Sequence, residues 1–225
     1  GRQEVRVEHE GGGVVAVEVV QVSRDQWREV ADIETRAFEN DPAARTFIPD
    51  RAQYYRFMGP FNRFGVRLNM LSGKLVEATT SMTATATWSP PGVTYSRWAM
   101  LRLLPQFMRT RRLATKEQYE SLMRWLSEQD QRRVQLLPEP HWNLDILAVD
   151  PDKQRFGLGA VLVRHGLTRA ANAKQPAYVE AHESATARFY GKCGFELMEH
   201  VDDGYPPLKI PAWRMVHRPG PPANS

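Results

Sequence analysis

The alternation of apolar and polar positions predicts strands and helices in mixed order along this chain. Short runs of apolar or alternating residues, bounded by Gly, Pro or Asp, are typical of strands. Such runs occupy residues 14–22, 74–78, 81–88, 144–149, 177–181, 195–201 and 209–216. Because the run at residues 144–149 is apolar almost throughout, we expect it to be a largely buried strand.

Apolar residues at helical spacing predict helices between these strands. One helix is expected over residues 23–38 and a second over residues 51–70, where Gly59-Pro60 favours an interruption. A short helix is expected over residues 184–193. Helices on both sides of a sheet are therefore the simplest arrangement.

Residues 95–137 differ from the rest because arginines are spread among apolar residues. This pattern predicts two or three amphipathic helices, with Pro105 at a break. We interpret the segment as a helical insertion that packs on the sheet and turns an arginine face to solvent. The alternative is a lid over the substrate or a dimer contact, since such insertions often hold recognition residues.

The order of the elements predicts an α/β protein, layered as in α+β folds, with a mixed central sheet of about six or seven strands flanked by helices. A chain of 225 residues fits one domain. We place this domain at residues 14–218, including the insertion, and expect residues 1–13 and 219–225 to be flexible.

Composition narrows the possible partners. The net charge of +4 is modest, and no dense Lys/Arg stripe stands out, so we expect no nucleic-acid partner. No apolar run approaches the length of a membrane span, so we expect no membrane partner and a cytoplasmic location. The single Cys193 excludes an intrachain disulfide and a Cys-rich zinc site, and no metal is expected. The first residue is not Met, which leaves a targeting segment open.

The segment after the strand at residues 144–149 carries candidate binding chemistry. It follows the turn Asp150-Pro151-Asp152 and reads Q-x-x-G-x-G over residues 154–159. Glycines let a ligand approach the backbone closely. The free N–H groups and the positive dipole end of a starting helix suit a phosphate. Neither common phosphate loop is present, since position 162 is Leu162 where G-x-G-x-x-G needs a third glycine.

A second motif, Phe189-Tyr190 followed by Gly194-Phe195, closes the short helix after the next strand. The two motifs, in this order and on these elements, resemble the acetyl-CoA signature and the closing motif of the GCN5-related N-acetyltransferase (GNAT) family. The resemblance is close over about residues 141–202 and loose elsewhere. The order of elements is similar to a small-molecule branch that includes puromycin N-acetyltransferase and many fungal members.

The resemblance implies the GNAT fold and acetyl-CoA as cofactor. The residues that it implies for cofactor binding are Leu147, Ala148, Val149, Gln154, Arg155, Phe156, Gly157, Leu158, Gly159, Ala160, Ser184, Thr186 and Tyr190. It also implies a backbone break at about residues 147–149, which would free an N–H for the developing oxyanion. Two positions depart from the family pattern: Thr186 stands where Asn is frequent, and Arg155 replaces a frequent glycine.

The implied reaction is direct acetyl transfer from acetyl-CoA to an amine. An aliphatic amine with a pKa of about 10.4 arrives protonated and must lose a proton before it attacks. Tyr190, at the family tyrosine, is the candidate acid for the thiolate, because a phenol donates a hydrogen bond without carrying charge. Glu180 is the candidate base, directly or through a water, because the branch has a glutamate ten positions before the tyrosine.

Asp145 and Asn143 are weaker alternatives for the base, since they share one face of the central strand. A carboxylate in an apolar run is costly to bury unpaired, which makes Asp145 the more informative of the two. His182 and His141 have a suitable intrinsic chemistry but are not first choices.

Three functions remain open at this level. The first is acetylation of a small-molecule amine by a monomer or homodimer. The second is acetylation of a protein or peptide, and the third is a non-catalytic GNAT fold that senses acyl-CoA. The aromatic residues at 54–64 and the long insertion favour a covered pocket over an open peptide groove. The acceptor amine itself is not predicted.

Overall fold

The computed structural model describes residues 3–8 and 14–220. In this part of the chain, eight strands form one mixed sheet in the order β1-β2-β3-β4-β5-β6-β8-β7. The strands are β1 Gln3–Glu8, β2 Val14–Gln21, β3 Leu75–Thr79, β4 Ala84–Ser89, β5 Trp142–Val149, β6 Ala177–Ala181, β7 Glu196–Val201 and β8 Ala212–His217. The helices are α1 Trp27–Ala37, α2 Pro42–Phe47, α3 Arg51–Leu71, α4 Arg97–Arg111, α5 Lys116–Leu136, α6 Leu158–Asn172 and α7 Ser184–Lys192, with a 3₁₀ turn at Pro151–Lys153.

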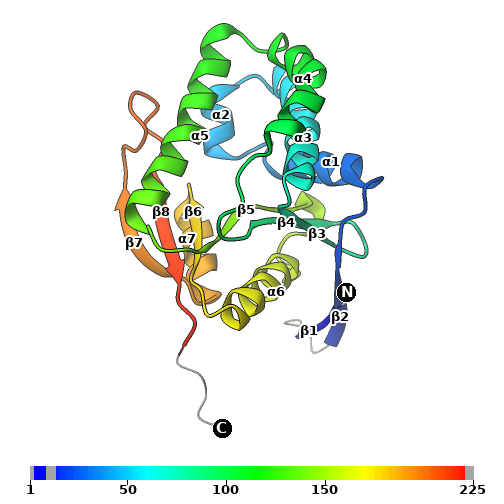
Figure 1. Ribbon diagram of the computed structural model, residues 1–225, viewed down its shortest axis with the longest axis vertical. Coiled ribbons are helices and arrows are strands. Elements are labelled where there is room, and N and C mark those ends of the chain that lie inside the picture. The colour runs from blue at the N-terminus through cyan, green and yellow to red at the C-terminus, as the bar shows by residue number, and fades with distance from the viewer. Residues whose placement is uncertain (1–2, 9–13, 221–225) are drawn as a thin grey trace.

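Helices cover both faces of the sheet (Figure 1). Helices α6 and α7 lie on one face, and the helices of the first 136 residues lie on the other. The largest apolar cluster joins α6 and α7 to the sheet around Trp88, which is fully buried. Helix α6 can approach this closely because residue 166 is glycine: a Cβ there would lie 2.1 Å from Cε2 of Trp88.

The pairing of β5 organises the sheet. It runs antiparallel to β4 and parallel to β6, so the sheet changes direction at this strand. The register against β4 slips by one residue, because Thr87 faces Ile146 while Trp88 faces Leu144. Asp145 is therefore the bulged residue of the central strand.

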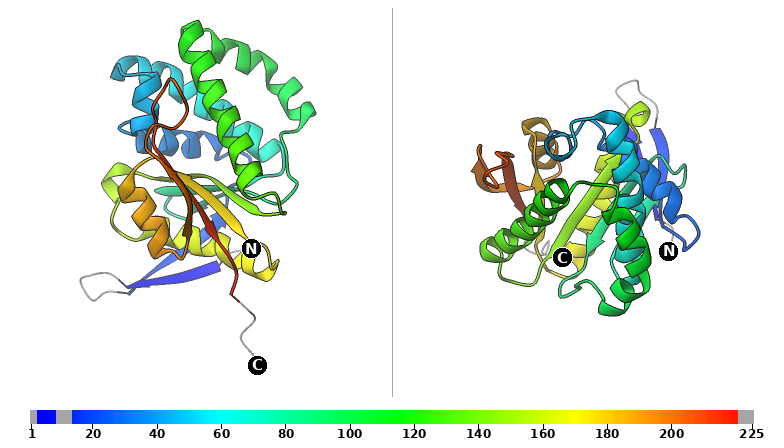
Figure 2. Two further views of the ribbon diagram at one scale, coloured as in Figure 1. Left: turned by 90° about the vertical axis from the view of Figure 1, so that its left-hand side faces the viewer. Right: turned by 90° about the horizontal axis from the view of Figure 1, so that it is seen from above.

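The insertion consists of two helices, α4 and α5, rather than three. Pro105 lies inside α4, and the break falls after Arg112. Thr115 caps α5 through a capping box with Gln118. Figure 2 shows the two helices standing on the side of the sheet that lies opposite α6.

Two further expectations differ from the structure. Helix α3 runs unbroken through Pro60, because Phe57 on one side and Phe64 on the other are both buried and hold its two halves in place. Residues 3–8, inside the segment expected to be flexible, form strand β1 paired with β2, so the sheet has one strand more than expected. Of the other residues expected to be flexible, 219–220 are described and belong to no helix or strand, and 1–2, 9–13 and 221–225 lie outside the described residues.

Glu34 is an unusual residue of α1, because its carboxyl group is buried at 1% exposure. Its Oε1 atom has no hydrogen-bond partner among the described residues. Burial raises the pKa of Glu34 to about 8. The folded state therefore keeps a proton that the unfolded chain releases near its ordinary pKa of 4.5.

We predict that stability falls as the pH rises from about 4.5 through about 8, because the unfolded chain then binds fewer protons than the folded one. Glu34→Gln should remove this slope and stabilise the protein at pH 9 by a few kcal/mol, since each pKa unit is worth about 1.4 kcal/mol. Urea unfolding at pH 5, 7 and 9 measures the effect. Parallel pH profiles of the two proteins would contradict it.

Candidate active site

The gap between β5 and β6 is the central feature of the site. Trp142 pairs with Ala177 and Asn143 with Tyr178, and beyond these pairs the two strands have no further pairing in the described chain. Parallel strands normally continue their ladder. The backbone groups that β5 and β6 turn toward each other after this point are therefore open to a ligand.

Helix α6 begins at the carboxyl end of β5, next to this gap. The N–H groups of Leu158, Gly159 and Ala160 have no acceptor among the described residues, and the first backbone bond of the helix comes from the Val161 N–H to Gly157 O at 3.1 Å. Three outward N–H groups and the helix dipole suit an anion. This is the position at which the sequence predicts phosphate binding.

The backbone of the turn before α6 explains its glycines. Gly157 has φ of +77° and Arg155 has φ of +68°, both in the left-handed region. A glycine at position 155 would adopt this conformation without strain, so the family's frequent glycine there has a physical reason, and Arg155 carries the strain in this chain. Gly159 is different, because a Cβ there would sit 3.5 Å from Phe189 Cζ, an ordinary contact. The protein's own packing therefore does not require a glycine at this position.

These observations fit the diphosphate of coenzyme A. The donor set consists of backbone N–H groups, with Lys153 and Arg155 exposed beside it. Residues 147–149 pair regularly with β4, so the backbone break expected there lies at Asp145 instead. Among the other residues predicted to bind the cofactor, Gln154 donates from Nε2 to Val149 O at 3.4 Å, Phe156 is exposed, and Ser184 and Thr186 lie on the first turn of α7.

Tyr190 lies on α7, buried against Phe195 at the end of the helix. The helix ends in a Schellman arrangement, with Phe195 N–H donating to Tyr190 O and Gly194 N–H to Gly191 O. Gly194 has φ of +94°, as this ending requires. Burial raises the pKa of Tyr190, so its hydroxyl stays protonated. That state is the one an acid needs.

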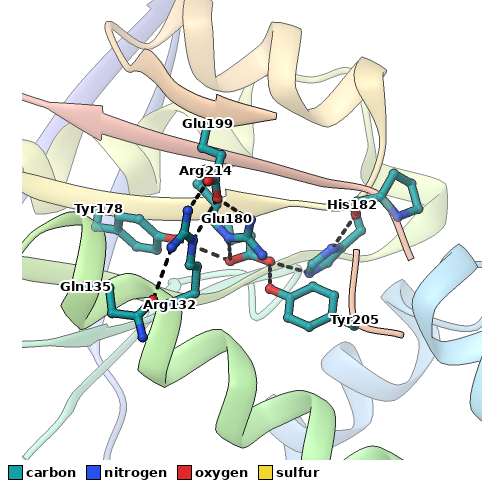
Figure 3. Close-up of polar contacts among 9 residues, drawn as sticks. Arg132, Gln135, Tyr178, Glu180, His182, Glu199, Tyr205 and Arg214 are labelled. Carbon is teal, nitrogen blue, oxygen red and sulfur yellow. Dashed lines mark hydrogen bonds and ion pairs between the residues drawn. The ribbon is translucent and has the colours of Figure 1, made fainter. Parts of the chain in front are cut away.

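Glu180 is the centre of a buried polar network (Figure 3). Its Oε1 accepts from the Tyr205 hydroxyl, and its Oε2 accepts from Tyr178 OH and Arg214 Nε, both at 3.2 Å. The side chains of Glu180 and Arg214 are 7% and 5% exposed. Glu180 is therefore paired with a buried guanidinium, which fixes its carboxylate in position.

The network continues from Arg214 to the insertion. Arg214 Nη1 donates to Glu199 Oε2 at 2.5 Å, and Glu199 also binds Arg132 of α5. Hydrogen bonding from Arg132 holds the pKa of Glu199 below its ordinary value. Burial alone lowers the pKa of Arg214, but Glu180, Tyr205 and Glu199 together outweigh it, and the pKa is raised. The chain of charges thus links α5 to β7, β8 and β6.

His182 follows the last residue of β6, and its side chain lies near that of Glu180 (Figure 3). Its Nδ1 is 3.0 Å from Pro211 O, a contact in which only the nitrogen can be the donor. Nε2 is then the acceptor nitrogen of the neutral ring, and it lies 3.9 Å from Glu180 Oε1. A water or an amine nitrogen could contact both atoms at once.

Asp145 also lies at the gap, on the opposite strand from Glu180. It forms an ion pair with Lys74 at 3.3 Å and accepts from Ser89 Oγ at 2.5 Å and Asn143 Nδ2 at 2.6 Å. Burial by itself lowers the pKa of Lys74, but Asp145 and Tyr95 together outweigh it, and the pKa is raised. The charge of Asp145 is thus balanced by Lys74 and by two hydrogen bonds, one of them donated by Asn143. The free-energy cost of an unpaired buried carboxylate, which made Asp145 a candidate base, is therefore removed.

His141 is a structural residue rather than a base. Its Nδ1 is 2.7 Å from Glu139 O and its Nε2 is 2.6 Å from Arg133 Nη1. Burial lowers its pKa, so the ring is neutral. A separate surface hollow of about 480 Å³ opens at the start of α3 and the turn before α5, and none of its lining residues belongs to β5, β6 or α6.

No sequence motif points to five further residues of the site, which are Tyr205, Arg214, Glu199, Arg132 and Lys74. Their partners lie far away in sequence; Arg214 follows Glu180 by 34 residues and Lys74 precedes Asp145 by 71. One signal was present in the sequence. Arg214 stands inside an otherwise apolar strand, where a buried cation needs a carboxylate partner.

Comparisons with known proteins agree with this geometry. Residues 123–197 match the family model described as the acetyltransferase (GNAT) domain. Among solved structures, one similar in fold is a Corynebacterium glutamicum protein described as histone acetyltransferase HPA2 and related acetyltransferase. It has 18% identity and a TM-score of 0.61, and covers 93% of this chain and 100% of its own.

Two more solved structures have the same fold. Arylalkylamine N-acetyltransferase 2 from Aedes aegypti has 13% identity and a TM-score of 0.59, covering 91% of this chain and 99% of its own. A putative acetyltransferase from Salmonella typhimurium, solved with its cofactor acetyl-CoA, has 11% identity and a TM-score of 0.54, covering 93% of this chain and 97% of its own. The predicted GNAT fold is confirmed.

The matched domain and the fold define the class of protein. It is an acyl-CoA-dependent N-acyltransferase, and acetyl-CoA is the cofactor of this class. The resemblance to the small-molecule branch and to its fungal members stays a prediction.

We predict that a negative charge in the first turn of α6 weakens binding of coenzyme A. Ala160→Glu should raise the dissociation constant about tenfold or more relative to Ala160→Gln, because the carboxylate repels the diphosphate. A glutamate in this turn favours the helix itself, so the fold should persist. Calorimetric titration of both variants at low and high salt measures the difference, which should shrink with salt. Equal affinities would argue against a diphosphate at this helix.

Proposed function

We propose that the protein transfers the acetyl group of acetyl-CoA to the amine of a small molecule. The observation that carries this proposal is the placement of Glu180 two residues beyond Tyr178, the last residue of β6 that pairs with β5, where the gap begins. Acetyl-CoA supplies an acetyl group activated as a thioester. The protein must then orient the amine, take its proton and protect the site from water.

The cover over this part of β6 favours a small acceptor. Trp125 of α5 lies 5.2 Å from the His182 ring and 5.3 Å from the Phe47 ring, so aromatic side chains from two helices close over the strand. A peptide would need an open groove at the same place. Solved proteins of similar fold include acetyltransferases named for arylalkylamines, which agrees with a small amine.

In the proposed mechanism, the carboxylate of Glu180 attracts the ammonium form of the acceptor and receives its proton, directly or through a water shared with His182. Tyr205 and Arg214 hold the carboxylate in place. Backbone N–H groups of β5 that face the gap are available to the acetyl oxygen. Tyr190, which keeps its proton, donates to the departing thiolate.

We predict that Tyr190→Phe lowers kcat about a hundredfold while the dissociation constant for coenzyme A changes less than threefold, the pattern of a lost proton donor. Thiol release with a panel of small amines gives kcat. A variant with full turnover would remove the acid role from Tyr190.

We predict that Glu180→Gln lowers kcat more than His182→Gln does, by about a hundredfold against about tenfold, if the carboxylate is the primary base. Thermal unfolding of both variants separates lost catalysis from the instability of an unpaired Arg214. The reverse order of effects would assign the base to His182. Turnover on peptides alone would favour a protein acetyltransferase, and coenzyme A binding without turnover on either would favour a sensor.

A further inference from the structure

The outer face of α4 is the most apolar exposed surface among the described residues. Of the twelve exposed large hydrophobic residues, six fall between positions 95 and 108. Four of them, at intervals of three and four residues, share one side of the helix; they are Trp98 at 82% exposure, Leu101 at 61%, Leu104 at 44% and Met108 at 46%. We call these four residues the α4 outer face. The opposite side of α4 packs through Ala99 and Leu103.

Positive charge surrounds the α4 outer face. Residues 93–116 contain Arg97, Arg102, Arg109, Arg111, Arg112 and Lys116, and no Asp or Glu. With +4 on the whole chain and +6 on this segment, the rest of the chain carries −2. No carboxylate among the described residues forms an ion pair with the five arginines. The arginines are therefore available to an external anion.

The helical positions place the arginines beside the apolar stripe. At 100° per residue, Arg102 and Arg109 lie along one edge of the α4 outer face and Arg111 lies beyond the other, while Arg97 is in line with the stripe at the first turn of the helix. An apolar stripe with a tryptophan, edged by cations, is the pattern of a helix that lies in the surface of an anionic membrane. The long arginine side chains can reach the headgroups while the apolar residues enter the acyl boundary.

From these observations we propose that α4 docks the protein on an anionic lipid surface. A second copy of this chain is a poorer occupant, because two α4 outer faces would bring like-charged arginines together without a carboxylate between them. A partner protein would be expected to find a groove, but this face belongs to a single outward helix at the far end of the molecule from α6 (Figure 1).

Docking of this kind agrees with the rest of the fold. No helix in the described part of the chain has the length and hydropathy to cross a bilayer, so α4 would lie on the surface. From the sequence we expected no membrane partner, because the exposure of Trp98 and Leu101 becomes visible only in the folded protein. Since α6 lies on the opposite face of the sheet, docking through α4 leaves the turn before α6 accessible to its ligand.

The test is co-sedimentation of the full chain with vesicles. Vesicles of phosphatidylcholine alone are compared with equimolar phosphatidylcholine and phosphatidylserine, at low and high salt. The proposal predicts binding to the phosphatidylserine vesicles, weaker binding at high salt and little binding to phosphatidylcholine. Equal binding to both vesicles, or binding to neither, would overturn it.

Matched variants localise the effect. Two double variants should each weaken vesicle binding about tenfold or more. One combines Trp98→Ala with Leu101→Gln, and the other combines Arg102→Gln with Arg109→Gln. Val134→Gln and Arg124→Gln make the same kinds of change at exposed positions of α5 and should leave binding within about twofold. Circular dichroism and coenzyme A binding confirm that each variant is folded. Equal losses in the control variants would place the contact elsewhere.

Light scattering across a range of protein concentrations tests whether a second copy of the chain covers the α4 outer face instead. One outcome is a dimer that dissociates in the double variant Trp98→Ala, Leu101→Gln. This result would assign the α4 outer face to a second copy and overturn the proposal. A monomer that binds phosphatidylserine vesicles supports it.

Discussion

The separation of β5 from β6 after two paired residues is the constraint on which the site depends. A parallel pair that continued would use its backbone groups within the sheet and leave no entry for a ligand. Because the pairing stops at Asn143 and Tyr178, a carboxylate from each strand, Asp145 and Glu180, stands at the mouth of the gap. The start of α6 adds three free N–H groups beyond the end of β5.

The buried charges around the gap have a clear division of roles. Asp145 is compensated by Lys74, Ser89 and Asn143, and it holds the bulge of the central strand. Glu180 is fixed by Tyr205 and Arg214, and Arg214 in turn is bound by Glu199. Tyr205 adopts φ of +57°, a conformation that costs free energy for a bulky residue. Its packing on Trp125 and its hydrogen bond to Glu180 maintain this conformation. Since Glu199 also binds Arg132, helix α5 is part of the same network that orients the proposed base.

Local patterns predicted the parts of the fold that depend on neighbouring residues. The turn at residues 150–157, the start of α6 and the glycine ending of α7 follow from turn and capping chemistry, which the sequence displays directly. The unbroken α3 was missed because the burial of Phe57 and Phe64 outweighs the cost of Pro60. The pairings of Arg214 and Lys74 could not be predicted, because each joins segments that meet only in the folded sheet. Strand β1 depends on its pairing with β2 in the same way. The cytoplasmic location and the oligomeric state stay predictions.

The central claim is that the gap and the first turn of α6 together hold acetyl-CoA, with its thioester next to Glu180. The most direct measurement is a crystal structure of the full chain with acetyl-CoA bound. We expect the diphosphate on the N–H groups of Leu158, Gly159 and Ala160, and the acetyl group between β5 and β6 near Tyr190. Density for the cofactor at another place, with the turn at residues 154–159 empty at saturating ligand, would contradict it.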